Sequence, residues 1–251
     1  MELELSGKNA LVTGSSGGIG LAVAAALQAE GCRVALNGRD AARLQEAGRK
    51  LGCVATIAGD VTDSLQARRI VAEATVALGG LDILVCNVGS GRSLPPGQET
   101  PGEWQRVFAQ NLWSTTNMVE AARQALARSR GTIVCISSIC GSEVIPGAPI
   151  TYSAAKAALH AYVRGIARPL GVEGVRINAI ASGNILFDSS IWAKKIENDI
   201  AGVEAMLARE VALARLGTPS DIAATVTYLV SPRAAFATGA IWTLDGGQVR
   251  A

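Results

Sequence analysis

Short apolar segments alternate with longer helical patterns from one end of this 251-residue chain to the other. Strands and helices that alternate in this way build a parallel sheet covered by helices on both faces. Seven segments are predicted as strands, at residues 10–12, 33–36, 54–57, 83–86, 132–136, 176–180 and 241–244. The alternation therefore predicts an α/β, doubly wound fold with a seven-stranded parallel sheet.

The segments between these strands have helical length or period, at residues 19–30, 41–51, 65–78, 103–127, 152–170 and 220–229. Several of them end at glycine, a common helix stop. No repeat or linker divides the chain, so we predict one domain over residues 1–251. One long connection, residues 184–216, has no strand and contains Phe187, Trp192 and Met206. It is predicted to be either a lid over a bound molecule or a plain helical insertion.

Composition and charge exclude several classes of protein. Although 49% of the residues are hydrophobic, no apolar stretch reaches the roughly 20 residues that cross a bilayer. The N-terminus carries Glu2 and Glu4 instead of the basic start of a secretory signal. The net charge is only +2, with basic and acidic residues interspersed. We therefore expect a cytoplasmic protein with neither a membrane nor a nucleic acid as its partner.

Cysteine and histidine usage argues against a metal site. The five cysteines are odd in number, lack CxxC spacing and lie mostly in apolar segments (Cys32, Cys53, Cys86, Cys135 and Cys140). This pattern is typical of buried, reduced thiols. The single histidine, His160, excludes a multi-histidine metal site and is predicted on a helix surface or at a subunit contact.

A glycine-rich turn follows the first predicted strand and leads into an alanine-rich helix. It reads Thr13-Gly14-Ser15-Ser16-Gly17-Gly18-Ile19-Gly20. Glycines allow positive φ and let backbone N–H groups approach a pyrophosphate, which the positive end of the helix then stabilises. A strand before the turn and a helix after it are the context of a dinucleotide-binding fingerprint. The turn therefore predicts a dinucleotide site in the N-terminal half.

Tyr152 and Lys156 are four positions apart on a predicted helix and so lie on one face. A phenol with an ordinary pKa of about 10 is a poor proton donor or acceptor near neutral pH. A nearby ammonium favours the phenolate and lowers that pKa. The pair is therefore a candidate for proton transfer, with Lys156 tuning Tyr152. The alternative is a solvated helix face.

The spacing Thr-Gly-x-x-x-Gly-Ile-Gly, followed much later by Tyr-x-x-x-Lys, resembles the short-chain dehydrogenase/reductase family in its classical type, near the 3-oxoacyl-acyl-carrier-protein reductases. The resemblance covers nearly the whole chain. It implies a single Rossmann-like domain, with a cofactor-binding half at about residues 1–130 and a catalytic half at about 131–251. It also implies a homo-oligomer, with a tetramer favoured.

The resemblance further implies a set of cofactor-binding positions in this sequence. Two departures from the family follow the sixth predicted strand, where Ser182 replaces the usual Pro and Phe187 lies near the usual Thr. Another lies in the turn after the fourth strand, where Cys86 replaces the first Asn of the family's Asn-Asn-Ala-Gly. The implied positions, outside the second strand, are Gly14, Ser16, Gly18, Ile19, Asp60, Val61, Asn87, Gly89, Tyr152, Lys156 and Ile185.

The end of the second predicted strand bears on which nicotinamide cofactor is bound. An acid there accepts bonds from the ribose hydroxyls of NAD, whereas a base pairs with the 2′-phosphate of NADP. Here Gly38 stands where the family's NAD-preferring members carry Asp, Arg39 follows, and Asn37 can add a neutral bond. Against this, Asp40 can pair with Arg39, and Gly17 lies where many NADP-preferring relatives carry a second base. The prediction is NADP(H), with NAD(H) as the alternative.

The resemblance also implies the rest of the catalytic set. A hydroxyl at the end of the fifth predicted strand binds the carbonyl oxygen as charge develops. Ser138 is assigned this role, with Ser137 as the alternative, because consecutive strand side chains point to opposite faces. Asn111 corresponds to the family's helix-kinking Asn, which holds a water against the lysine in a proton relay.

The resulting hypothesis is an NADP(H)-dependent oxidoreductase that acts on a small-molecule ketone or secondary alcohol, with Tyr152 as acid in reduction and base in oxidation. Nucleotide-sugar epimerases and dehydratases share the Tyr and Lys pair but usually carry a larger C-terminal substrate domain. The other alternative is a dinucleotide-binding regulatory or scaffold protein without turnover.

Overall fold

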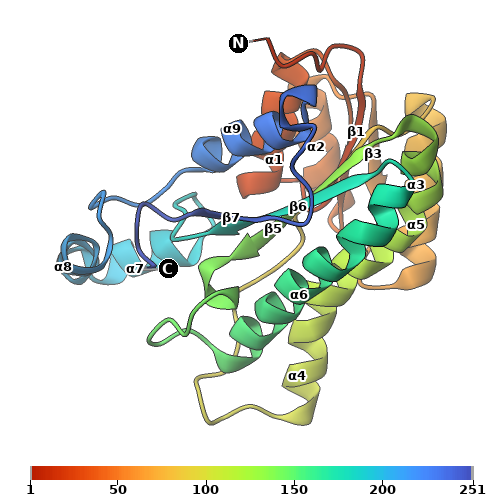
Figure 1. The fold of residues 1–251 in the computed structure, drawn as a ribbon. Helices are drawn as coiled ribbons and strands as arrows, with labels where there is room; N and C mark the ends of the chain where they lie inside the picture. Colours follow the sequence, from red (N-terminus) through yellow and green to blue (C-terminus); the bar gives the residue numbers. More distant parts are fainter. Residues whose placement is uncertain (1, 250–251) are drawn as a thin grey trace.

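The computed structural model describes residues 2–249, which form a seven-stranded sheet in the order β3-β2-β1-β4-β5-β6-β7. Every neighbouring pair of strands is parallel. The predicted doubly wound α/β fold is therefore confirmed (Figure 1). The strands are β1 (Asn9–Val12), β2 (Arg33–Gly38), β3 (Ala55–Ala58), β4 (Ile83–Cys86), β5 (Thr132–Ser138), β6 (Arg176–Ser182) and β7 (Ile241–Leu244).

Helices cover both faces of this sheet (Figure 1). One face carries α1 (Gly18–Ala29), α2 (Ala41–Leu51) and α9 (Pro219–Val230). The other carries α3 (Ser64–Leu78), α5 (Ser114–Ser129) and α6 (Ile150–Val172). Alternate residues of β1 enter the two apolar clusters, Ala10 and Val12 on one side and Leu11 on the other. Strands buried on both faces read as continuous apolar runs, which explains why the sequence marks them clearly.

Local sequence explains where α2 and α3 begin and end. Asp40 and Asp63 cap their N-termini, each accepting backbone N–H groups of the first turn. Both helices end at a glycine in the left-handed region, Gly52 with φ 67° and Gly79 with φ 78°. Glycine adopts this conformation without strain, so it ends a helix where other residues would resist the turn.

The helical pattern predicted over residues 103–127 is confirmed, and a π-helical turn interrupts its α-helical hydrogen bonding. The chain forms α4 (Pro101–Phe108), a π-helical turn (Ala109–Trp113) and then α5. Single π-helical turns within α-helices often occur at functional sites. The predicted site residue Asn111 lies in this turn.

Strand order reverses at β1, because the chain first moves outward to β2 and β3 and then returns to β4 on the other side. The loops that leave the carboxyl ends of β1 and β4 therefore diverge. In open α/β sheets, ligands bind in the crevice that such a reversal creates. The glycine turn follows β1 and Asn87 follows β4, so the fold places both at this crevice.

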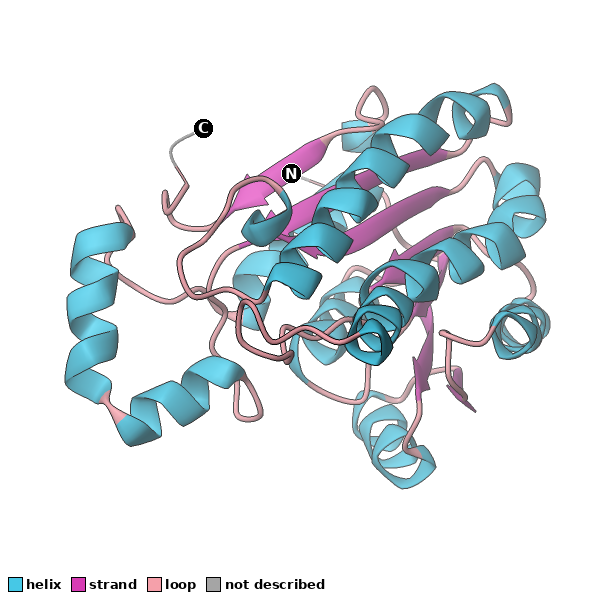
Figure 2. Ribbon diagram, turned by 90° about the horizontal axis from the view of Figure 1, so that it is seen from below, coloured by secondary structure: helices cyan, strands magenta, loops and turns pink. Residues whose placement is uncertain are grey.

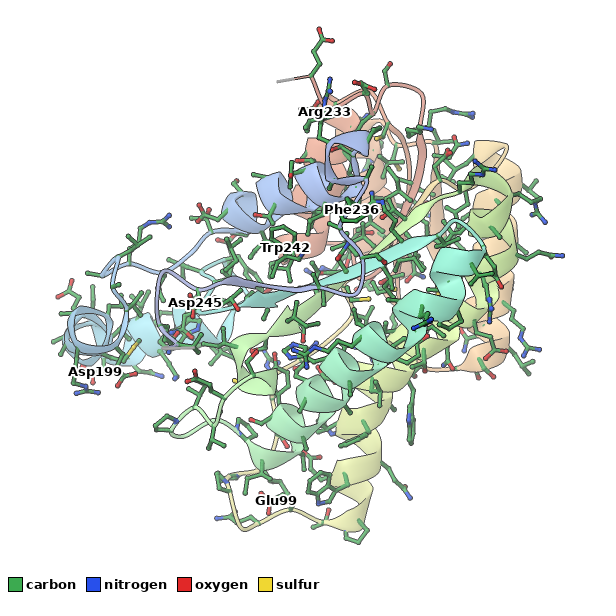
Figure 3. The ribbon with its side chains drawn as sticks, viewed as in Figure 1. Glu99, Asp199, Arg233, Phe236, Trp242 and Asp245 are labelled. Carbon is green, nitrogen blue, oxygen red and sulfur yellow. The ribbon has the colours of Figure 1, made fainter. Side chains whose placement is uncertain are left out.

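The connection over residues 184–216 contains two helices, α7 (Ile191–Asn198) and α8 (Ile200–Glu210), and no strand. Trp192 from α7 and Met206 from α8 pack against one small apolar cluster. The pair stands out from the body of the molecule in Figure 2, and Asp199, between the two helices, lies at its outer end in Figure 3. Its predicted role as a lid stays a prediction.

None of the helices within residues 2–249 is both long and apolar enough to span a bilayer. Over the same residues, no three His, Cys, Asp or Glu side chains gather as a possible metal site. Cys32, Cys86 and Cys135 are buried, whereas Cys53 and Cys140 are half-buried.

Candidate active site

Side chains tie the glycine turn to the strands on both sides of β1. The Ser15 hydroxyl accepts the backbone N–H of Asn37, in β2, at 3.1 Å. On the other side, Asn87 Nδ2 donates to the carbonyls of Thr13 and Gly14 at 3.1 and 3.0 Å. The departure at Cys86 leaves this second tie intact, because Asn87 alone makes it. The turn is therefore held in the crevice between β2 and β4.

The backbone of the turn fits a pyrophosphate. Gly14 and Gly18 have φ of 60° and 56°, in the left-handed region. Gly20 leaves no room for a side chain, because a Cβ built there would lie 2.5 Å from Asn87 Nδ2. Gly17 caps α1, and within residues 2–249 no side chain accepts the first N–H groups of that helix. Open N–H groups at a helix N-terminus are suited to an anionic group.

Asn37 and Arg39, at the end of β2, have different surroundings. Asn37 is 1% exposed, and its Nδ2 donates to the carbonyls of Ile57 and Gly59 at 3.0 and 3.3 Å. Both amide hydrogens are thus engaged, so Asn37 has none left for the predicted bond to a phosphate. Its Oδ1 is buried and has no hydrogen-bond partner among the described residues. Arg39 is exposed and remains the group suited to a phosphate.

Asp40, which the sequence suggested as an alternative ion-pair partner for Arg39, is engaged elsewhere. Asp40 accepts the backbone N–H of Arg43 at 3.1 Å as the N-cap of α2. The nearest carboxylate to Arg39 belongs instead to Asp60, at 3.9 Å. Asp60 in turn accepts the hydroxyl of Thr62 at 2.8 Å. The pairing is too long to hold the guanidinium firmly.

Val61, predicted beside Asp60 at the adenine, is buried. Its carbonyl accepts Asn117 Nδ2 at 3.1 Å, which anchors the end of β3 to α5. The roles of Asp60 and Val61 at an adenine stay predictions.

The structure brings together Ser138, Tyr152 and Lys156 at the carboxyl end of β5. Lys156 is 3% exposed, its Nζ donates to the Ile136 carbonyl at 3.0 Å, and this Nζ lies 5.8 Å from the centre of the Tyr152 ring. The Ser138 side chain is also close enough to Tyr152 to lower the pKa of its phenol. The Ser138 hydroxyl also accepts the backbone N–H of Cys140 at 3.2 Å, which fixes its position. The predicted catalytic trio is therefore contiguous.

Burial governs the pKa values of the Tyr152 and Lys156 pair. Desolvation raises the pKa of Tyr152 to about 12, and the nearby Ser138 side chain offsets only part of that rise. Desolvation also lowers the pKa of Lys156 to about 8. The expected lowering of the Tyr152 pKa by Lys156 is thus not found, because desolvation of the phenol is the largest influence on it. At neutral pH Tyr152 is protonated and Lys156 is charged.

Ser137 and Ser138 point to opposite faces of β5. The Ser137 hydroxyl lies 2.8 Å from His160 Nε2, and both residues are buried. This geometry favours Ser138 as the hydroxyl beside Tyr152. The prediction of His160 on a helix surface is wrong, because it lies one turn after Lys156 on the buried face of α6. Burial lowers the pKa of His160 to about 4.

Asn111 fastens the loop after β4 to the π-helical turn. It is fully buried, its Nδ2 donates to the carbonyls of Val107 and Ser90 at 3.0 and 3.1 Å, and its Oδ1 accepts the Ser90 N–H at 3.0 Å. Gly89 separates it from Lys156: a Cβ built on Gly89 would lie 2.9 Å from Asn111 Oδ1 and 3.2 Å from Lys156 Nζ. Asn111 therefore holds the loop against the lysine. The water relay stays a prediction.

Ile185 forms an isolated bridge with Gly217 beyond the end of β6. The bridge uses the Asn184 carbonyl and the Leu186 N–H, at 2.9 and 2.8 Å. The peptide groups of Ile185 itself therefore point away from Gly217. This orientation is compatible with the predicted contact to a carboxamide.

The two departures after β6 have visible consequences. The Ser182 hydroxyl, in place of the usual Pro, donates to the Ser137 carbonyl at 3.1 Å and so joins β6 to β5. The Phe187 ring, near the place of the usual Thr, lies against the glycine turn. A Cβ built on Gly18 would be 2.9 Å from Phe187 Cε2.

One polar network at the site was missed by reasoning from the sequence. The Ser93 hydroxyl donates to Glu103 at 2.8 Å and lies 2.5 Å from the hydroxyl of Thr151, which precedes Tyr152. Hydrogen bonds from Arg106 and Ser93 lower the pKa of Glu103 to about 2. The members come from three separate segments, so no spacing in the sequence marks them. The network joins the loop after β4 to the start of α6.

Comparisons with known proteins agree with this geometry. The family described as Enoyl-(Acyl carrier protein) reductase matches residues 14–248. A galactitol 2-dehydrogenase (L-tagatose-forming) of Cereibacter sphaeroides is 35% identical over 97% of this chain and 95% of that protein. A 3-oxoacyl-acyl-carrier-protein reductase of Staphylococcus aureus is 33% identical over 96% of this chain and 98% of that protein.

Solved structures share the fold over the whole chain. An L-sorbose reductase from Gluconobacter frateurii, in complex with NADPH and L-sorbose, superposes with a TM-score of 0.92 at 28% identity over 100% of both chains. A 7α-hydroxysteroid dehydrogenase, in complex with NADH and 7-oxo glycochenodeoxycholic acid, superposes with a TM-score of 0.89 at 28% identity, covering 100% of this chain and 97% of that one. The same fold thus serves different cofactors and substrates.

Proposed function

Because the chain belongs to the short-chain dehydrogenase/reductase family, we propose that it transfers a hydride between NADP(H) and a ketone or secondary alcohol, with Tyr152 moving the proton. At a coarser level the chain is a nicotinamide-dependent oxidoreductase of alcohol and carbonyl groups. The observation that carries the proposal is that Ser138, Tyr152 and the buried Lys156 lie together at the end of β5. This trio adjoins the crevice that holds the glycine turn.

The end of β2 supports NADP(H) over NAD(H). Gly38 provides no carboxylate to receive ribose hydroxyls, and the Arg39 guanidinium is exposed and only loosely paired, 3.9 Å from Asp60. A guanidinium matches a phosphate with parallel N–H donors. Relatives have been solved with NADPH and with NADH, so the preference rests on Arg39 and not on the family.

Proton transfer follows from the pKa values of the chain's own groups. Tyr152, with a pKa of about 12, is protonated at neutral pH and so donates to the carbonyl oxygen during reduction. Ser138 donates a neutral hydrogen bond to the same oxygen as negative charge develops. When bound, the nicotinamide supplies the hydride to the carbonyl carbon or accepts it from the alcohol carbon. In reduction the C=O π bond breaks, and the oxygen takes the proton from Tyr152.

Lys156 and Asn111 support the proton transfer by Tyr152. With a pKa of about 8, Lys156 is charged at neutral pH and stabilises the tyrosinate that proton donation leaves behind. Asn111 keeps the loop after β4 beside the lysine, and we assign it the link through which Tyr152 regains a proton from water. The homotetramer implied by the resemblance remains a prediction.

The test is consumption of NADPH and NADH by the purified protein with a ketose, a cyclic ketone, a steroid ketone and a 3-oxoacyl thioester. The proposal expects turnover of at least one carbonyl compound, with a lower KM for NADPH than for NADH. Tight cofactor binding without turnover of any compound would contradict it. That result would favour a dinucleotide-binding protein without catalysis.

A further inference from the structure

Arg43, in the first turn of α2, reaches back to the glycine turn. A Cβ built on Gly17 would lie 3.5 Å from Arg43 Nη2. Gly17 caps α1, so the Arg43 guanidinium lies beside the N-terminus of that helix. Arg43 of α2 thus occupies the space beside Gly17, which has no side chain of its own.

Two further polar groups lie at the same edge. A Cβ built on Gly38 would lie 3.5 Å from Ser16 Oγ. The glycine turn thus places the Ser16 hydroxyl beside Gly38, and the first turn of α2 places the Arg43 guanidinium beside Gly17. Arg39 follows directly after Gly38, between β2 and α2.

The two arginines are poorly neutralised. The carboxylate of Asp40 is engaged as the N-cap of α2, where it accepts the Arg43 N–H at 3.1 Å. Asp60 Oδ2 lies 3.9 Å from Arg39 Nη1, and Asp60 Oδ1 accepts two hydrogen bonds from Thr62. In the part of the chain that the structure describes, Arg43 has no carboxylate within 4.0 Å of its guanidinium. Guanidinium groups that are only loosely paired with acids create a positive field that attracts an anion.

We propose that Arg43 is the second cation for the 2′-phosphate of NADP(H), opposite Arg39, with the Ser16 hydroxyl as a neutral donor. The proposal rests on the proposed NADP(H)-dependent function and names a further residue that makes the cofactor site selective. A phosphate monoester carries between one and two negative charges near neutral pH. A second guanidinium therefore adds to the phosphate affinity that the first provides. The two planar guanidinium groups can donate hydrogen bonds to different phosphate oxygens.

The test compares dissociation constants for NADPH and NADH in the wild type, Arg39→Ala, Arg43→Ala and the double variant. Arg49→Ala, an exposed arginine in the last turn of the same helix, is the matched control. Loss of one charge-assisted contact at an exposed site corresponds to roughly a tenfold weaker affinity. Arg43→Ala should therefore weaken NADPH about tenfold and leave NADH within about twofold. The double variant should bind the two cofactors about equally, and Arg49→Ala should match the wild type.

Unchanged NADPH affinity in Arg43→Ala, with a loss in Arg39→Ala, would overturn the inference and leave the proposed NADP(H) preference standing. Equal losses for NADPH and NADH in Arg43→Ala would also overturn it, because Arg43 would then serve a part common to both cofactors. A wild-type protein that binds NADH more tightly would refute the proposed cofactor itself. The two failures are therefore distinguishable from one set of titrations.

Discussion

Replacement of Asn111 by leucine tests how much the site depends on one buried side chain. The change removes three hydrogen bonds, to the Val107 carbonyl at 3.0 Å and to the Ser90 carbonyl and N–H at 3.1 and 3.0 Å. Each such bond contributes about 1 kcal/mol to the free energy of unfolding, and more where a buried partner is left unsatisfied. The variant should therefore lose about 3 kcal/mol. For a chain of this size, that corresponds to a fall in Tm of roughly 6–12 °C.

The assay is unfolding in urea followed by circular dichroism, with thermal denaturation as a second readout. Asn198→Leu is the matched control, because Asn198 is exposed in the last turn of α7, and it should change the free energy by less than about 0.5 kcal/mol. A loss of under about 1 kcal/mol for Asn111→Leu would refute the reasoning. It would mean that the loop after β4 is held by other contacts and that the π-helical turn does not depend on Asn111.

Two further predictions concern the Ser137 and His160 pair and its neighbour Ser138. The pKa of His160 falls from 6.5 to about 4 on folding, so the unfolded chain binds the extra proton first and stability drops as pH falls from about 6.5 to 4. At pH 5 the free energy of unfolding should be lower by roughly 2 kcal/mol than at pH 7 because of this single histidine. Urea unfolding at both pH values measures the difference. An equal loss in His160→Gln would show that His160 is not its source. Ser138→Ala should lower kcat by about two to three orders of magnitude through loss of a donor to the developing charge, while Ser137→Ala should mainly lower stability. Steady-state kinetics that placed the larger kcat loss on Ser137 would reverse the assignment.

Central strands such as β1 and β4 were predictable because burial on both faces leaves each as a nearly continuous apolar run, whereas β7 is partly exposed. The glycine turn was predictable because the positive φ at Gly14 and Gly18 favours glycine, so the residue type itself indicates the backbone conformation. Tyr152 and Lys156 were predictable as neighbours because helical spacing alone puts them on one face.

Features that depend on contacts between distant segments were not predictable. The resemblance implies a kink at Asn111, but the sequence does not show that Asn111 bonds there to Ser90, 21 positions earlier. The burial of His160 could have been predicted, because a residue four positions after Lys156 lies on the same buried face of the helix. The pKa of Tyr152 is higher than the sequence predicts because desolvation of the phenol, which only the folded structure determines, is the largest influence on it.

The central claim is that Tyr152 moves the proton, and the most direct test is a single turnover of NADPH with a carbonyl substrate by the wild type and by Tyr152→Phe. The dissociation constant for NADPH is measured on both proteins in parallel. The account predicts a fall in rate of about two to four orders of magnitude, with the NADPH dissociation constant changed by less than about threefold. A Tyr152→Phe variant that turned over within tenfold of the wild-type rate would contradict it.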